Sequence, residues 1–126
     1  MSVVLDTNAV IHLLRGDARW IWGNDVPVSV SVITEIELLG WPGLAGEEEM
    51  AIKTFLARMI VEGITPSIKQ AAIAFRRDQR LRIPDAIIAA TAAVHGGTLI
   101  TNDRKLLGLD VIKSLPLVMI QPESSD

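Results

Sequence analysis

The feature that most constrains the fold is the alternation of short β-branched runs with segments of helical period. Residues 3–5, 26–33 and 98–101 are rich in Val, Ile and Thr, and the segments between them carry apolar residues at helical spacing. Strands that alternate with helices form a parallel sheet covered on both faces, with right-handed crossovers. The sequence therefore predicts an α/β protein, a three-layer α/β/α sandwich around a central, mostly parallel sheet of four to five strands.

The same pattern predicts where the helices and the remaining strands lie. Ser31 or Thr34 can cap a helix that runs to Gly40, and Pro66 suits the first turn of a long helix. No charged residue lies between Ala86 and Val94, so that helix is expected to be buried on nearly every side. The predicted helices are 9–14, 20–22, 34–40, 47–62, 66–82, 85–95 and 102–107, and the further strands are 64–65 and one within 110–120.

Chain length and composition limit the protein class. A chain of 126 residues with 49% hydrophobic residues can close a core without covalent staples, and we expect one domain over residues 1–121 with a frayed tail at 122–126. The absence of cysteine excludes disulfides and thiolate ligands, which argues against zinc. No apolar run approaches the roughly 18 residues of a membrane span, and no hydrophobic leader is evident. We therefore expect a cytoplasmic protein.

Three aspartates follow strands or open helices. Asp6, Asp85 and Asp103 each have a purely structural interpretation, as a helix cap or a first-turn carboxylate stabilised by the helix dipole. Because open parallel sheets bind ligands at the carboxyl ends of their strands, Asp6 and Asp103 also stand where a site is expected.

Glu37 is harder to explain structurally. It lies in an apolar helix pattern, where a charged side chain is costly unless it is paired or bound to metal. Glu35 is the rival candidate, because the two are about 200° apart on a helix and only one can face a common site. Periodicity does not choose between them, and we expect the solvated one to be Glu35.

Together these acids indicate a metal site. Clustered carboxylates repel one another, and a divalent cation removes the conflict. Oxygen ligands without cysteine or clustered histidine favour Mg²⁺ or Mn²⁺, which can activate water for phosphodiester hydrolysis. The net charge of −3 is no objection, because setting four of the 15 acidic residues aside leaves 11 against 12 Lys and Arg.

Four segments that contain these acids follow one another in a recognisable order. They are Val4-Leu5-Asp6-Thr7-Asn8 with Leu13-Leu14-Arg15-Gly16-Asp17, Ser31-Val32-Ile33-Thr34-Glu35-Ile36-Glu37-Leu38, Leu81 to Ala92, and Thr98-Leu99-Ile100-Thr101-Asn102-Asp103. In this order they resemble the PIN-domain nucleases, and among them the VapC toxins of toxin–antitoxin pairs. The resemblance covers nearly the whole chain and implies a PIN-like fold. It places the four family acids at Asp6, Glu37 rather than Glu35, Asp85 and Asp103.

The resemblance also implies roles for neighbouring residues and for partners. Thr7 or Asn8 and Thr101 would hydrogen-bond the carboxylates or the waters of the metal. The protein would be an Mg²⁺- or Mn²⁺-dependent endoribonuclease that cleaves RNA, forms a homodimer and is held by a cognate antitoxin. The chain also has more large apolar side chains than so small a core requires, and the resemblance assigns such surface to these interfaces, although most of them could be core residues. We expect a mixture of the two among Trp20, Trp22, Trp41, Met50, Phe55, Leu56, Met59 and Ile60.

Other side chains are weaker candidates. Lys69, Arg76 and Arg80 fall on one helical stripe, and Arg104 lies beside Asp103, so these four are candidate RNA-phosphate contacts. A solvated helix face explains the stripe nearly as well. His12 and His95 are poor candidates for a general base, because the first lies in an apolar pattern and the second ends a helix.

Three alternatives to a ribonuclease stay open. The chain could be a catalytically weak module that binds RNA or a partner. It could also be a DNA-cleaving nuclease, because four carboxylates do not distinguish ribose from deoxyribose. A phosphoacceptor receiver domain also carries clustered acids, but it needs adjacent acids after its first strand and a lysine after its last, and neither is evident.

Overall fold

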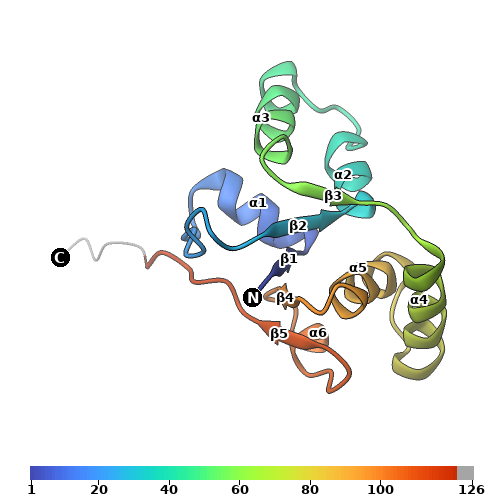
Figure 1. The fold of residues 1–126 in the computed structure, drawn as a ribbon. Helices are drawn as coiled ribbons and strands as arrows, with labels where there is room; N and C mark the ends of the chain where they lie inside the picture. Colours follow the sequence, from blue (N-terminus) through green and yellow to red (C-terminus); the bar gives the residue numbers. More distant parts are fainter. Residues whose placement is uncertain (122–126) are drawn as a thin grey trace.

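The structure, a computed structural model, describes residues 1–121, and in that range strands and helices alternate along the chain (Figure 1). The expectation of a frayed tail at 122–126 falls outside the described residues. None of the helices in the described range has the length and apolar run needed to span a bilayer. The elements are β1 (Val3–Leu5), α1 (Thr7–Arg15), β2 (Val28–Ser31), α2 (Val32–Leu39), α3 (Gly46–Leu56), β3 (Ile60–Glu62), α4 (Pro66–Gln79), α5 (Ile83–Val94), β4 (Thr98–Ile100), α6 (Arg104–Leu107) and β5 (Lys113–Leu115).

The five strands form one parallel sheet in the order β3-β2-β1-β4-β5. The chain builds outward from β1 to β3 and then crosses to β4 and β5 on the other side of β1. The strand order therefore reverses between β1 and β4, which is where open α/β sheets bind ligands.

Alternate residues of β1 face opposite layers of the molecule. Val3 and Leu5 belong to a core cluster with residues of α1, α2 and α3, whereas Val4 belongs to a second cluster with residues of α4, α5 and α6. Figure 1 shows α1 and α3 on one side of the sheet and α4 and α5 on the other. The predicted three-layer α/β/α sandwich is confirmed.

The apolar helix predicted at 85–95 is α5, and it is buried as expected. Six of its residues are buried: Ala86, Ile88, Ala89, Ala90, Thr91 and Ala92. Thr91 is the polar member of this group, and its hydroxyl donates to the Ile87 carbonyl at 2.8 Å within the same helix. The small side chains let α5 lie close against the sheet and α4.

Three predicted elements are wrong. The predicted helix 47–62 ends at Leu56, and Ile60–Glu62 instead pairs with β2 as the edge strand β3. Thr65 is not in a strand, because its side chain caps α4 by accepting from the Ile68 N–H. Residues 20–22 form no helix: the Trp20 indole N–H donates to the carbonyl of Gly23, whose φ of 59° belongs to a turn.

The end of α2 requires a glycine. The Gly40 N–H donates to the Ile36 carbonyl at 2.8 Å, and a Cβ at Gly40 would lie 2.6 Å from that carbonyl oxygen. Since the oxygen is backbone, it cannot move aside without distorting the last turn of the helix.

We therefore expect Gly40→Ala to lower the free energy of unfolding by about 1–3 kcal/mol, the usual cost of forced overpacking. Gly46→Ala is the matched control, because a Cβ at this first residue of α3 would meet nothing within 4 Å. Alanine also favours the helix, so Gly46→Ala should be neutral or stabilising. Urea unfolding of both variants measures the difference, and equal stabilities would refute the steric explanation.

Candidate active site at the carboxyl ends of the strands

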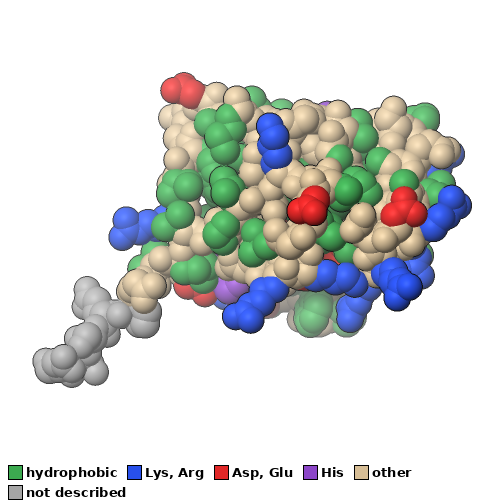
Figure 2. All heavy atoms as spheres, turned by 90° about the horizontal axis from the view of Figure 1, so that it is seen from below, with side chains coloured by type: hydrophobic (Ala, Val, Ile, Leu, Met, Phe, Trp, Pro, Cys, Tyr) green, Lys and Arg blue, Asp and Glu red, His purple; other side chains and the backbone are tan. Residues whose placement is uncertain are grey.

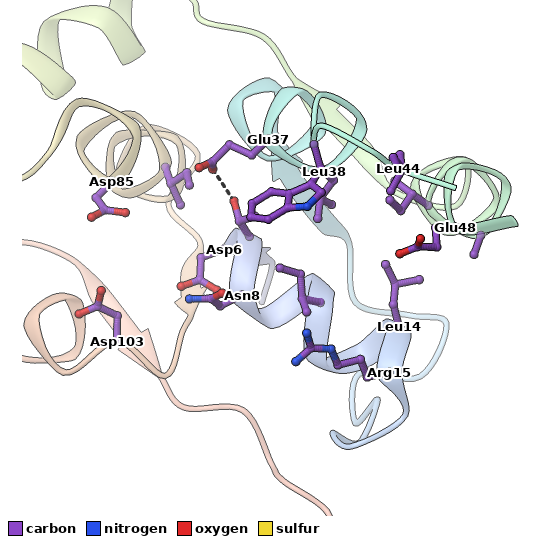
Figure 3. A pocket seen from close by; sticks show the side chains of 16 residues that line it. Asp6, Asn8, Leu14, Arg15, Glu37, Leu38, Leu44, Glu48, Asp85 and Asp103 are labelled. Carbon is purple, nitrogen blue, oxygen red and sulfur yellow. Dashed lines mark hydrogen bonds between the residues drawn. The ribbon is translucent and has the colours of Figure 1, made fainter. Parts of the chain in front are cut away.

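One pocket of about 650 Å³ gathers the four predicted acids, Asp6, Glu37, Asp85 and Asp103. They come from four separate places in the chain: the end of β1, the middle of α2, the first turn of α5 and the segment after β4. Figure 3 shows Asp6, Asp85 and Asp103 around one end of the pocket, with Glu37 extending towards it from α2. The pocket lies at the reversal of strand order.

Asp6 is the most buried of the four acids and has two roles. It is 6% exposed, and it caps α1 by accepting from the Ala9 N–H at 2.8 Å. Burial raises the pKa of Asp6 above its ordinary value; hydrogen bonds from Thr101 and Ala9 oppose this, and the charges of Asp103 and Asp85 add to it. The structural interpretation of Asp6 as a cap is correct. An ionised carboxylate has several acceptor sites, however, so its remaining sites can still bind a metal ion.

Glu37 is held in place by a chain of hydroxyl groups. The Thr7 hydroxyl donates to Glu37 Oε1 at 2.7 Å and lies 3.0 Å from the hydroxyl of Thr34, which is fully buried. Because Thr7 has one proton to give, Thr34 must be the donor to Thr7. Glu35 does not line the pocket. It is partly buried rather than fully solvated as we expected.

Asp85 shows most directly how the acids affect one another. Burial raises the pKa of Asp85 above its ordinary value, and the negative charges of Asp103 and Glu37 raise it further. Arg82 and Lys105 oppose this rise without overcoming it. The lining of the pocket is itself unbalanced in charge, because it includes five acidic residues and one basic residue, Arg15.

Asp103 is placed by the turn that follows β4. Its backbone N–H donates to the Thr101 hydroxyl at 3.0 Å, and its Oδ1 accepts from the Lys105 N–H at 2.8 Å, which caps α6. Thr101 thus supports two of the acids, Asp6 and Asp103. Of the other residues predicted to have supporting roles, Thr7 contacts Glu37, and Asn8 lines the pocket without a side-chain hydrogen bond in the described part of the chain.

The donor set fits a hard divalent cation in its chemistry. All four acids offer oxygen, and the unfavourable charge at Asp6 and Asp85 is the kind that Mg²⁺ or Mn²⁺ relieves. Within residues 1–121, however, no three of these side chains lie close enough together to hold one ion as they stand. The carboxylates face a common space and would have to converge to ligate metal.

The predicted basic stripe is partly wrong. Lys69, Arg76, Arg80 and Arg104 are exposed, but α4 ends at Gln79 and Arg80 adopts a left-handed conformation with φ 55°, so Arg80 leaves the stripe. The Arg76 guanidinium donates to the Leu81 carbonyl at 2.7 Å, which fixes the turn between α4 and α5. The Arg80 carbonyl accepts from Lys105 Nζ at 3.0 Å, which joins the same turn to α6.

Basic side chains nevertheless gather on this side of the molecule. Figure 2 shows Lys and Arg towards its right-hand end, over the part where Figure 1 draws α4 and α5. We call the exposed basic residues of this region the basic surface; they are Lys69, Arg76, Arg77, Arg80, Arg82, Arg104 and Lys105.

Sequence reasoning did not place three residues of this site. Thr34 was considered only as a helix cap, although it is the buried donor behind Thr7 and Glu37. Arg15 and Trp41 line the same pocket as the acids. Trp41 lies in the turn after α2, which ends at Leu39, so helical spacing from Glu37 could not have placed it. His12 and His95 pair with Asp17 and Glu62 and lie outside the pocket, as the poor prospects of both histidines suggested.

The raised pKa of Asp85 predicts how the metal-free protein responds to pH. A carboxyl whose pKa is raised by folding costs stability above that pKa, because the unfolded chain ionises more easily. Asp85→Asn should therefore raise the melting temperature of the metal-free protein at pH 7, and the gain should shrink as acid protonates Asp85 in the wild type. Asp110→Asn, at an exposed aspartate outside the pocket, is the control and should change little. A lower melting temperature for metal-free Asp85→Asn would contradict the repulsion.

Comparisons with known proteins agree with this architecture. The model of the PIN domain family matches residues 3–111. No curated protein matches the chain. Among solved structures, the chain resembles one in VapBC2 from Rickettsia felis bound to a DNA fragment from the promoter, with 16% identity, a TM-score of 0.79, and coverage of 92% of this chain and 98% of that one.

Two further structures are similar. A toxin–antitoxin complex from Klebsiella pneumoniae matches with 27% identity and a TM-score of 0.71 over 90% of this chain and 95% of that one. DNA-bound VapBC from Salmonella typhimurium matches with 22% identity and a TM-score of 0.78 over 92% of this chain and 98% of that one. Since the family model spans most of the sequence and the fold agrees, the chain belongs to the PIN domain family, whose members are generally nucleases.

Proposed function

We propose that the chain is an Mg²⁺- or Mn²⁺-dependent endoribonuclease and the toxin of a VapBC-type toxin–antitoxin pair, acting in the cytoplasm with residues 1–121 as its nuclease domain. The observation that carries the proposal is the convergence of Asp6, Glu37, Asp85 and Asp103 on one pocket from four separate segments. A cap or a first-turn position explains each aspartate taken alone. Neither explains why the acids share one pocket whose negative charge is uncompensated.

In this proposal the four carboxylates hold the cation. When bound, Mg²⁺ or Mn²⁺ supplies an activated water and neutralises charge on the phosphodiester. Thr7 orients the Glu37 carboxylate through its 2.7 Å hydrogen bond. Backbone N–H groups fix Asp6 and Asp103 from one side. A fixed carboxylate loses less conformational freedom on binding, so these contacts favour ligation.

The choice of RNA and of an antitoxin partner draws on several supports. The basic surface beside Asp85 and Asp103 suits the phosphates of a nucleic acid, in a manner blind to sequence. The similar structures from Rickettsia felis, Salmonella typhimurium and Klebsiella pneumoniae are toxin–antitoxin complexes.

Large apolar side chains stand exposed on three helices. Met50 of α3 is 65% exposed, Ile73 of α4 is 45% exposed and Ile83 of α5 is 59% exposed. Exposed apolar area of this kind is where partners dock, and we propose it as contact area for a cognate antitoxin and for a second copy of the chain.

The proposal predicts RNA cleavage that needs a divalent cation and the acids. Purified protein with Mn²⁺ or Mg²⁺ should cut an unstructured single-stranded RNA, and EDTA should abolish the cut. Asp6→Asn should lower the rate by at least about 100-fold, because it removes a ligand charge. Asp78→Asn, at an exposed aspartate of α4 outside the pocket, should cleave like the wild type.

The substrate and the biological role are tested with the same variants. A single-stranded DNA of the same sequence should stay intact. Induced wild-type protein should arrest growth while Asp6→Asn does not, and co-expression of the cognate antitoxin should restore growth. Intact RNA with metal-loaded wild type, or equal growth arrest by Asp6→Asn, would refute the nuclease and favour a module that binds without cutting.

The hydroxyl chain predicts a second, graded effect. Thr7→Val keeps the side-chain shape but removes the donor to Glu37 and the acceptor for the buried Thr34 hydroxyl. We expect Mn²⁺ affinity and cleavage rate to fall by about 10- to 100-fold, and stability to fall by about 1–3 kcal/mol. Thr7→Ser, which keeps the hydroxyl, should retain most of both. Calorimetric titration with Mn²⁺ measures the affinity, and equal affinities for the valine and serine variants would show that the hydroxyl does not act on Glu37.

A further inference from the structure

The pocket that holds the acids extends well beyond them. Figure 3 shows Leu14, Arg15, Leu44 and Glu48 at the end away from Asp85 and Asp103, with Asn8 nearer the acids. The volume of the whole pocket, about 650 Å³, is in the range of small-molecule sites and is larger than the volume that a metal ion needs. The metal chemistry described above uses none of these residues, nor Trp41, which lines the same pocket. We call the part of the pocket lined by Leu14, Arg15, Trp41, Leu44 and Glu48 the outer pocket.

Trp41 is a large aromatic side chain left open in this part of the pocket. It is 69% exposed. It takes no part in the aromatic cluster in which Trp20 contacts Trp22 and Phe55. An indole that lines a pocket with its surface uncovered is available to stack on a planar ligand.

The backbone around Trp41 is shaped so as to hold it there. Gly40 ends α2 in a turn that tolerates no Cβ, and the Leu44 N–H donates to the Trp41 carbonyl at 3.2 Å. Gly43 between them has φ 79°, a conformation that favours glycine. This tight turn directly follows the helix that carries Glu37. The helix places the Glu37 carboxylate on the pocket, and the turn that follows it places the Trp41 indole there.

Arg15 is the one Lys or Arg among the residues that line the pocket. It is the last residue of α1, the helix that Asp6 caps, so the two are separated by about 13 Å of helix axis. Arg15 is exposed, and it forms none of the ion pairs found within residues 1–121. Its guanidinium is therefore free to meet a phosphate, for which its planar donor fork is well suited.

We propose that the outer pocket binds an unpaired nucleobase of the single-stranded RNA substrate, stacked on Trp41, with a neighbouring phosphate held by Arg15. This inference rests on the proposed ribonuclease function and names the form of its substrate. A base within a duplex is covered on both faces and cannot stack on the indole. Aromatic stacking tolerates every base, so the outer pocket selects for single strands rather than for a sequence.

A peptide is the competing occupant, because Leu14 and Leu44 also line the outer pocket. Arg15 decides the choice for nucleic acid. An exposed aromatic side chain and a cation lining one pocket are the combination with which proteins bind single strands, and the acids of the same pocket act on phosphodiesters in the proposed reaction. RNA can occupy both ends with one continuous backbone.

Steady-state cleavage of a labelled single-stranded RNA in Mg²⁺ tests the stacking. Trp41→Ala should raise KM roughly 5- to 100-fold with little change in kcat, because stacking of this strength affects binding and not the chemical step. Trp41→Phe should recover part of the loss. Trp20→Phe is the matched control, because Trp20 is partly exposed outside this pocket, and it should behave as wild type. A fall in kcat at unchanged KM for Trp41→Ala would overturn the proposal.

Binding without cleavage separates this inference from the proposed function. In Asp103→Asn protein, a single-stranded hexanucleotide RNA should quench tryptophan fluorescence, and the quenching should be lost with Trp41→Phe and kept with Trp20→Phe. Arg15→Gln should reduce the salt dependence of binding by about one charge, a change that Arg15→Lys should largely avoid. This pattern supports the outer pocket even where no RNA is cut. Equal quenching by RNA with and without Trp41, or no quenching by RNA at all, would refute it.

Discussion

The burial of carboxylates beside one another at the reversal of strand order is the constraint on which the rest of this structure depends. A parallel sheet brings the ends of β1 and β4 side by side, so Asp6 and Asp103 share one space by topology. The α5 helix adds Asp85, and the pKa of Asp85 is raised by burial and by the other acids. A fold that concentrates negative charge in this way is less stable without a cation than its core would allow.

The scaffold around the acids is arranged so as to keep that charge available. Asp6 and Asp103 each bind a backbone N–H at the start of a helix, which positions the carboxylate without neutralising it. Thr34 and Thr7 do the same for Glu37 through neutral hydroxyls. The Lys105 ammonium donates its hydrogen bond to the Arg80 carbonyl rather than to a carboxylate, although its charge opposes the pKa rise at Asp85. Placement by neutral donors leaves the carboxylates to attract a metal ion.

Local sequence chemistry was sufficient to place most of the fold and the aspartates. The strand at 3–5, the buried helix α5 and the caps at Asp6 and Asp103 follow from periodicity and capping, which act over a few residues. The edge strand β3 could not be placed in this way, because the residues before it favour helix and its hydrogen bonds are made to β2. Glu37 was chosen over Glu35 only through family resemblance, and its contact with Thr7, 30 positions away, agrees with that choice. Trp41 and Arg15 could not be paired from the sequence, because they line the same pocket only once the chain has folded.

The most direct test of the account is a crystal structure of the protein grown with Mn²⁺ and measured at an energy where manganese scatters anomalously. The account predicts an anomalous peak in the pocket about 2 Å from carboxylate oxygens of Asp6 and at least one other of the four acids. It also predicts that these acids lie closer together than in the metal-free arrangement. A pocket without an anomalous peak at saturating Mn²⁺, or a peak bound elsewhere on the protein, would contradict the central claim.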